Sequence, residues 1–213
     1  MARFLEYYNI VFRGHYVSQN DLMGENVLPD NAVMFREGDA MSDTFLPGFI
    51  TELPLLLAMI VLTFQRYRSL SLRYRLNWKI VFVVVIVLVL NNLLSYLHEI
   101  IHGLCYPKEA KKSIWKDKKQ GLMFIHCDAV VSKGQYFWIG ISPTVFLGLL
   151  PFVIWYLAVP YIPMPWSLSL VFVAWFMVLG AMGDFCNIMH MVTQVPKGAK
   201  VMNYGLHSYW FFL

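Results

Sequence analysis

The sequence of 213 residues has few charged side chains, and one long segment has none. Charged residues make up 14% of the chain, apolar residues make up 58%, and the mean hydropathy is +0.54. Asp, Glu, Lys, Arg and His are all absent from residues 134–183, a run of about 50 residues that could form two helical crossings of a bilayer. This composition excludes an ordinary soluble domain and predicts a membrane protein with several spans.

Cysteine is also scarce, which bears on the compartment. The three cysteines, Cys105, Cys127 and Cys186, are an odd number and form no CxxC pair. This pattern argues against a disulfide framework and favours inert thiols in a reducing compartment. The N-terminus lacks a basic start followed by an apolar stretch and a small-residue cleavage site, so we expect no removable secretion signal. The first apolar span would then serve as an uncleaved insertion signal.

Four apolar segments predict the fold class, an all-α membrane protein with about four transmembrane helices. The expected spans cover residues 49–64, 79–104, 136–159 and 167–192. Glu52 and Pro54 interrupt the first span, and three prolines end the third at residues 160–165. Residues 122–125 and 129–131 flank a turn-prone stretch between the second and third spans. This pattern predicts a small β-hairpin there.

The spans divide the chain into three expected parts. Residues 1–48 carry seven acidic and three basic side chains and form a polar N-terminal region, with a short amphipathic helix near residues 4–12. Residues 49–192 form the transmembrane core, and residues 193–213 form a C-terminal tail. Five basic residues lie in the short loop 66–79, whereas the tails and the second loop carry twelve on the opposite face. The larger number favours both termini in the cytosol.

A metalloprotease signature stands near the end of the second span. The string His98-Glu99-Ile100-Ile101-His102 fits the pattern HExxH. In a helix, positions i and i+4 lie on one face, so two imidazoles at this spacing can hold one zinc ion while Glu99 faces the water bound to it. The alternative is a hydrogen-bonded histidine pair in a helix bundle. Ionisable groups are costly at membrane depth, which favours the metal.

A catalytic zinc site usually has three protein ligands, so a third must come from elsewhere in the chain. Asp184 is the only acid in the fourth span. The second and fourth spans run parallel, and His98 and Asp184 lie at similar depths along them, at 1.5 Å per residue. We therefore predict Asp184 as the third ligand. The alternative is a carboxylate that pairs with Asn91, Asn92 or a nearby hydroxyl group.

Other polar residues in the apolar half of the chain are weaker candidates. Asn187, one turn after Asp184, could orient that carboxylate, bind a substrate carbonyl or simply pack. His126 and His190 are rival ligands, and Cys186 points away from Asp184 and belongs to the core. Glu52 could be a substrate gate or a shallow interfacial residue.

Residues 79–192 resemble the zincin peptidase family of small multi-pass membrane proteins, which is related to the site-2 protease clan of intramembrane metalloproteases. The resemblance rests on the HExxH string, on Ser142-Pro143 and on the segment Gly183-Asp184-Phe185-Cys186-Asn187. It implies His98, His102 and Asp184 as zinc ligands and Glu99 as the general base. It also places Pro143 near the substrate, although the clan has Asn-Pro where this chain has Ser142-Pro143, and Asp-Gly where it has Asp184-Phe185.

The predicted function is peptide-bond hydrolysis just inside a bacterial cell membrane, with Zn²⁺ activating water and Glu99 accepting its proton. The expected partners are a membrane protein or peptide substrate and the lipid bilayer. The basic loop 108–119 would rest on anionic headgroups rather than on nucleic acid. Two other functions are a non-catalytic zinc-binding protein, as a sensor or partner-binding module, and a metal transporter. Iron is an alternative to zinc for this ligand set.

Overall fold

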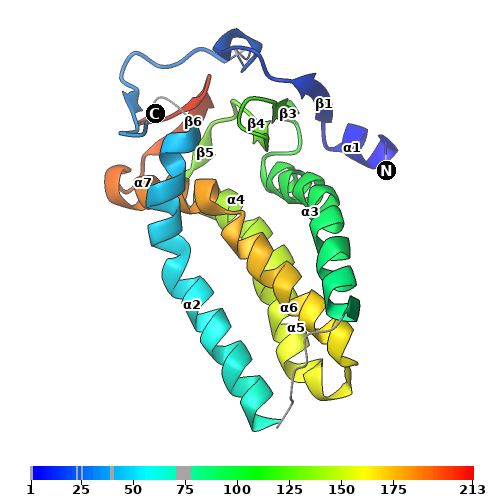
Figure 1. The fold of residues 1–213 in the computed structure, drawn as a ribbon. Coiled ribbons are helices and arrows are strands. Elements are labelled where there is room, and N and C mark those ends of the chain that lie inside the picture. Colours follow the sequence, from blue (N-terminus) through cyan, green and yellow to red (C-terminus); the bar gives the residue numbers. More distant parts are fainter. Residues whose placement is uncertain (1, 23, 25, 39–40, 71–77) are drawn as a thin grey trace.

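A computed structural model describes residues 2–22, 24, 26–38, 41–70 and 78–213 of the chain. It is mostly helical, with long helices that form an elongated bundle and two small β-sheets that cover one end of it (Figure 1). Both ends of the chain lie at the end with the sheets. Arg73 and Arg75 of the predicted basic loop lie outside the described residues.

The helical bundle is built from segments that match the apolar runs of the sequence. Its helices are α2 (Phe45–Ser69), α3 (Trp78–Cys105), α4 (Lys133–Pro143), a π-helical turn (Thr144–Leu149), α5 (Leu150–Ala158), α6 (Met164–Leu179) and α7 (Met182–Gln194). Helix α4, the π-helical turn and α5 follow one another without a break, and prolines close this long helix at residues 160–163.

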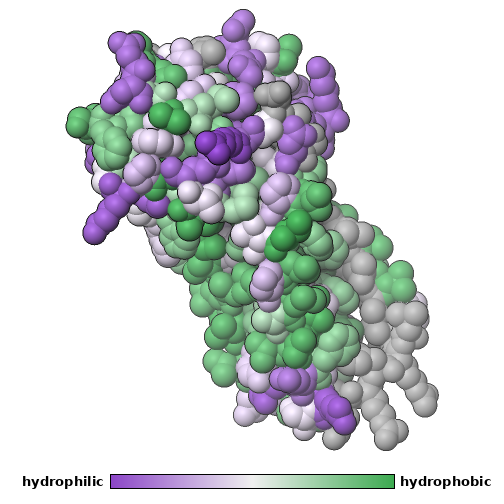
Figure 2. Space-filling model, turned by 90° about the vertical axis from the view of Figure 1, so that its left-hand side faces the viewer, coloured by the Kyte–Doolittle hydropathy of each residue, from purple (hydrophilic) through white to green (hydrophobic). Residues whose placement is uncertain are grey.

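Within the described residues, two helices, Phe45–Ser69 and Lys133–Tyr161, are long and apolar enough to cross a membrane, and a third crossing is possible if the bent pair α6 and α7 counts as one. The 25 residues of α2 span about 37 Å, which exceeds a hydrocarbon core of about 30 Å. Figure 2 shows apolar side chains along the helical part of the molecule and hydrophilic ones over the end with the sheets and at the opposite tip. This distribution is typical of a membrane protein.

The expected fourth span is not one straight helix. Helix α6 ends at Leu179, α7 begins at Met182, and the two axes differ by 45°. Gly180 stands at the break, where its low helix propensity favours a bend. The bend turns α7 away from the bundle axis, so Asp184 lies in the first turn of a separate short helix.

In the described part of the chain, the sheets contain seven strands from distant segments. They are β1 (Ile10–His15), β2 (Val33–Met34), β3 (Lys112–Asp117), β4 (Leu122–His126), β5 (Val131–Ser132), β6 (Lys200–Tyr204) and β7 (His207–Phe211). One sheet has the order β1-β3-β4, and the other has the order β2-β7-β6-β5. Each sheet thus joins one strand of the N-terminal region to later strands: β1 pairs with β3, and β2 pairs with β7.

The β-hairpin between α3 and α4 differs from the predicted one. Strand β4 pairs antiparallel with β3, whereas residues 129–131 were expected to pair with it. Val131 instead pairs with Val201 in the other sheet. The basic loop therefore contains a strand, and its Lys112 is buried, with Nζ donating to the carbonyl oxygens of Tyr8 and Lys108 at 2.7 and 3.1 Å. This lysine supports the fold and does not reach lipid.

The amphipathic helix expected near residues 4–12 is shorter in the structure. Helix α1 covers Ala2–Tyr7, and Asn9 adopts a left-handed conformation with φ of 52°, which ends the helical path. The β-branched and aromatic residues that follow form β1, which runs parallel to β3. Phe12 accordingly lies in a strand.

Helices α2 and α7 approach each other closely at Gly48. A Cβ atom added at this glycine would collide with the backbone carbonyl of Met182, at the start of α7. Backbone atoms cannot move aside as a flexible side chain can, so only glycine fits. The contact fixes the N-terminal turn of α7, which carries Asp184.

We expect Gly48→Ala to lower the free energy of unfolding by about 1–3 kcal/mol, because the added methyl group overpacks the contact between the two helices. Thermal unfolding of the full chain in detergent micelles measures this loss. Gly134→Ala is the matched control, since a Cβ atom there meets nothing within 4 Å. Equal stability of the two variants would contradict the close approach of α2 and α7.

Candidate metal centre

The last third of α3 presents two imidazoles on one face. His98 and His102 are one turn apart, and their ring centroids are 4.7 Å from each other. His102 and Glu99 are buried, and His98 is partly buried. His98 precedes the end of α3 by seven residues, or about 10 Å of helix, so this face lies near the sheets.

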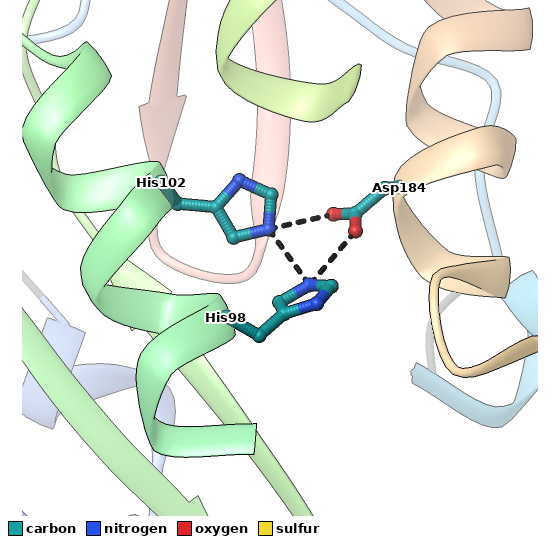
Figure 3. Close-up of side chains that lie close together, drawn as sticks. All are labelled: His98, His102 and Asp184. Atoms are coloured by element: carbon teal, nitrogen blue, oxygen red, sulfur yellow. Dashed lines mark hydrogen bonds and ion pairs between the residues drawn. The ribbon is translucent and has the colours of Figure 1, made fainter. Parts of the chain in front are cut away.

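Asp184 of α7 reaches both imidazoles, as Figure 3 shows. Its Oδ2 lies 3.0 Å from Nε2 of His98, and its Oδ1 lies 3.1 Å from Nε2 of His102. The two Nε2 atoms are themselves 3.0 Å apart. The structure therefore brings together the three side chains that the sequence predicts as ligands, with their ligand atoms within 4.8 Å of one another. The side chains of Asn91 and Asn92, the alternative partners, lie outside the described residues.

The hydrogen bond on the far side of His102 fixes which nitrogen faces the cluster. Nδ1 of His102 lies 2.7 Å from the carbonyl oxygen of Ile139 in α4 and donates its proton to it. In the neutral ring, Nε2 then carries a lone pair. This lone pair points toward Nε2 of His98 and toward a carboxylate, so the cluster needs a proton or a cation at its centre. Histidines that bind metals commonly donate their other ring N–H to a group such as a backbone carbonyl, which orients the imidazole.

The donor set and its spacing fit a zinc ion. Two imidazoles and one carboxylate are ligands that catalytic zinc sites use, and they leave a fourth position open. Around a tetrahedral ion with bonds near 2 Å, neighbouring ligand atoms lie about 3.3 Å apart. The distances of 3.0 to 3.1 Å between the three ligand atoms are close to this value. Small side-chain movements would admit the ion.

Glu99 lies between the cluster and the edge of a sheet. The backbone amide of Ile125 in β4 is a hydrogen-bond partner of its carboxylate. Within the described residues, β4 is the last strand of its sheet. In an antiparallel strand, alternate residues direct their N–H and C=O groups to the same side, so Met123 presents its backbone groups on the side of Ile125. The free edge of β4 therefore runs past Glu99.

A cavity of about 380 Å³ adjoins these groups. Its walls include the cluster and Glu99, all of β4, the start of α7 with Asn187, part of α4, and the turn between β6 and β7. Residues from the N-terminal region close another side, among them Leu22, Glu37 and Phe45. The volume is enough for several side chains of a peptide.

The other residues singled out from the sequence lie in different environments. His190 contacts Gln194 through Nδ1, at 2.6 Å. His126 is buried and lines the cavity, outside the three-residue cluster. Cys186 is buried, as expected for the core. Pro143 is buried in α4 and is not among the described residues that line the cavity.

Glu52 lies inside the protein, and its description as a shallow interfacial residue is wrong. The side chain is fully buried in α2, and neither carboxylate oxygen has a hydrogen-bond partner among the described residues. Helix α2 packs against α7 along this part of the bundle, and this packing contributes to the burial. The sequence placed Glu52 near a bilayer face because the first span was expected to begin only at residue 49.

Two features of the site were not predicted from the sequence. The carbonyl of Ile139 is a backbone group, and no side-chain pattern marks it. Glu37 lines the cavity, and burial raises the pKa of its carboxyl group, while the N–H of Ser208 and the imidazole of His207 act in the opposite direction. Its location depends on the pairing of β2 with β7, strands that are far apart in the chain.

Fold and site together define a helical protein with membrane-spanning character and a metalloenzyme-type cluster of two histidines and one carboxylate. The chain belongs to the family described as "Putative zincin peptidase", whose profile matches residues 91–200, just over half of the sequence. The matched segment contains His98, His102 and Asp184. No curated protein and no solved structure matches the chain. Membership of this family points to a zinc metallopeptidase.

Proposed function

We propose that this protein is an intramembrane zinc metallopeptidase of the site-2 protease type. The observation that carries the proposal is the convergence of the ligand atoms of His98, His102 and Asp184 within 4.8 Å, beside Glu99 and a cavity. A metal site with a purely structural role has no need of Glu99, because this residue is not a ligand. Its place next to the cluster favours catalysis over a silent zinc-binding role.

The residues of the site divide the work of hydrolysis. His98, His102 and Asp184 would hold Zn²⁺, which would supply Lewis acidity for the activation of water and the polarisation of the peptide carbonyl. Glu99 accepts the proton of the attacking water and passes it to the leaving amine. The Ile125 amide holds the Glu99 carboxylate in place for this transfer. The Asn187 amide, which lines the cavity, donates to the carbonyl oxygen of the substrate.

The free edge of β4 receives the substrate in extended form. A helical peptide hides its carbonyls in hydrogen bonds, so a membrane-embedded substrate must unwind before hydrolysis. Backbone groups of Met123 can then pair with it, because they project from the same edge as the Ile125 amide. This pairing places the scissile bond next to Glu99.

The proposal includes an arrangement of the protein in the membrane. We place the protein in a bacterial cell membrane with four crossings, in which α3 is one and the bent pair of α6 and α7 is another. Both termini and the end with the sheets face the cytosol. The exposed lysines of the turn between β3 and β4 lie against anionic lipid headgroups. The cavity then lies near the membrane surface, where water has access to it.

Metal removal tests the proposal directly. We expect hydrolysis of apolar peptides by the full chain in detergent to fall by at least about 100-fold after chelation, because the ligands alone cannot activate water. Addition of Zn²⁺ restores the rate, whereas Mg²⁺ does not, since it prefers oxygen ligands. A fluorogenic peptide measures the rate. Hydrolysis that survives complete removal of metal contradicts the proposal, and restoration by Fe²⁺ alone would reassign the metal.

A further inference from the structure

The cavity has an excess of negative charge. Its described lining residues include the acids Glu37, Glu99 and Asp184 and no lysine or arginine. A divalent ion in the cluster would balance Asp184 and Glu99. Glu37 would then remain as a further carboxylate in the lining, with the imidazole of His207 3.4 Å from its Oε1.

The backbone holds Glu37 firmly in the lining of the cavity. Strand β2 pairs with Tyr209 and Trp210 of β7, and the N–H of Phe35 donates to the carbonyl oxygen of Ser208 at 2.9 Å. The side chain of Phe35 is fully buried in the core. Glu37 follows two residues later, and only 7% of its side chain is exposed. A carboxylate held this way is a fixed feature of the cavity.

The contacts of this carboxylate leave room for a ligand. Oε1 accepts a hydrogen bond from the N–H of Ser208 at 2.7 Å and lies 3.4 Å from Nδ1 of His207. Within the described residues, both contacts fall on Oε1, which leaves Oε2 without a protein partner in a residue that lines the cavity. A buried carboxylate with one oxygen available gains most from a cationic partner that donates hydrogen bonds.

We propose that Glu37 makes the cavity selective for polypeptides that carry a cationic nitrogen near the bound segment, either a lysine side chain or a free amino terminus. The inference rests on the proposed function, because it names the class of peptide that the same site accepts. The ammonium group donates to Oε2 of Glu37 while the backbone of the peptide lies along β4. Glu37 is thus a specificity-determining residue and takes no part in the chemistry.

Binding to a protein that cannot hydrolyse the peptide provides the test. The probes are labelled, N-acetylated neutral peptides with one lysine placed at each position in turn, each paired with a norleucine peptide, and one further peptide with a free amino terminus. They are titrated into zinc-loaded Glu99→Gln protein. We expect at least one lysine peptide, or the peptide with the free terminus, to bind about 10-fold or more tightly than its neutral partner, as a charge-assisted hydrogen bond implies.

Glu37→Gln, added to the same protein, separates charge from structure. The amide oxygen still accepts the hydrogen bond from Ser208, so the fold is retained, but the preference for the cationic peptide should fall to about 2-fold or less. Asp30→Asn is the matched control, because it removes an exposed acid of the N-terminal region outside the cavity, and the preference should persist. A folded Glu37→Gln protein that keeps the full preference overturns the proposal.

Two further measurements complete the design. If Glu37→Gln does not fold, the parent protein is titrated with peptides in which lysine is shortened to ornithine and to diaminobutyrate, since a fixed carboxylate should favour one length several-fold. Equal affinity across this series and for norleucine overturns the inference. A Glu37-dependent preference in a protein whose parent chain hydrolyses no peptide would support the inference and contradict the peptidase function, so the two failures are distinct.

Discussion

Glu99→Gln should lower the rate of peptide hydrolysis by about 100-fold to 10,000-fold while zinc remains bound, as expected for loss of a general base. Glutamine has nearly the same shape and can still accept the hydrogen bond from Ile125, but it cannot take a proton from water. The three ligand side chains are untouched. Turnover of a fluorogenic peptide and the zinc content of the same sample measure the two effects.

The control for this variant is Glu109→Gln, which makes the same chemical change at an exposed position just after α3. It should retain the parent rate. Full hydrolysis by Glu99→Gln with zinc bound would remove Glu99 from the mechanism. If the parent protein binds zinc but hydrolyses nothing, the non-catalytic zinc-binding role becomes the better account. A comparison of the polypeptides captured in native membranes by Glu99→Gln and by the parent protein would then identify a binding partner.

Asp184→Asn should weaken zinc binding by about 100-fold or more. Loss of a residue that only hydrogen-bonds to a metal ligand costs about 10- to 100-fold in affinity, and loss of a ligand itself should cost more. The carboxamide has no charge, so it leaves a divalent ion between two neutral imidazoles in a partly buried site. Competition with a chromophoric chelator measures the affinity. Activity should fall in parallel at limiting zinc and recover in part at high zinc.

Asp30→Asn serves again as the control for an acid lost elsewhere in the chain, and it should bind zinc as the parent does. Unchanged affinity in Asp184→Asn would show that Asp184 does not bind the ion. His126 would then be the first residue to test in its place, because it also lines the cavity. Retained affinity together with lost activity would instead give Asp184 a role in orienting the substrate.

The sequence predicts the cluster because its parts follow regular helix geometry. The i and i+4 spacing places His98 and His102 on one face in any α-helix, and a fixed rise per residue relates the depth of His98 to that of Asp184. The break at Gly180 does not spoil this estimate, since it lies close to Asp184 and turns only the last part of the span. The boundaries of α3 also agree with the apolar run to within one residue.

Other parts of the structure could not be predicted, because they depend on pairing between distant segments. Strand β4 has two possible partners, β3 and residues 129–131, and its antiparallel pairing with β3 is favoured by the short turn between them. The pairing of β2 with β7 joins residues more than 170 positions apart, and nothing local indicates it. Glu37 and the Ile139 carbonyl enter the site only through such contacts.

The bend between α6 and α7 has a consequence for the stability of the whole chain. It places one ligand on a short helix of its own, so an ion bound there would cross-link α7 to α3. The loop closed between His102 and Asp184 is about 80 residues long, and fixing its ends removes much of the entropy of the unfolded chain. The metal would stabilise the fold as a cross-link, and the metal-free protein would unfold first at the contact between α7 and α3.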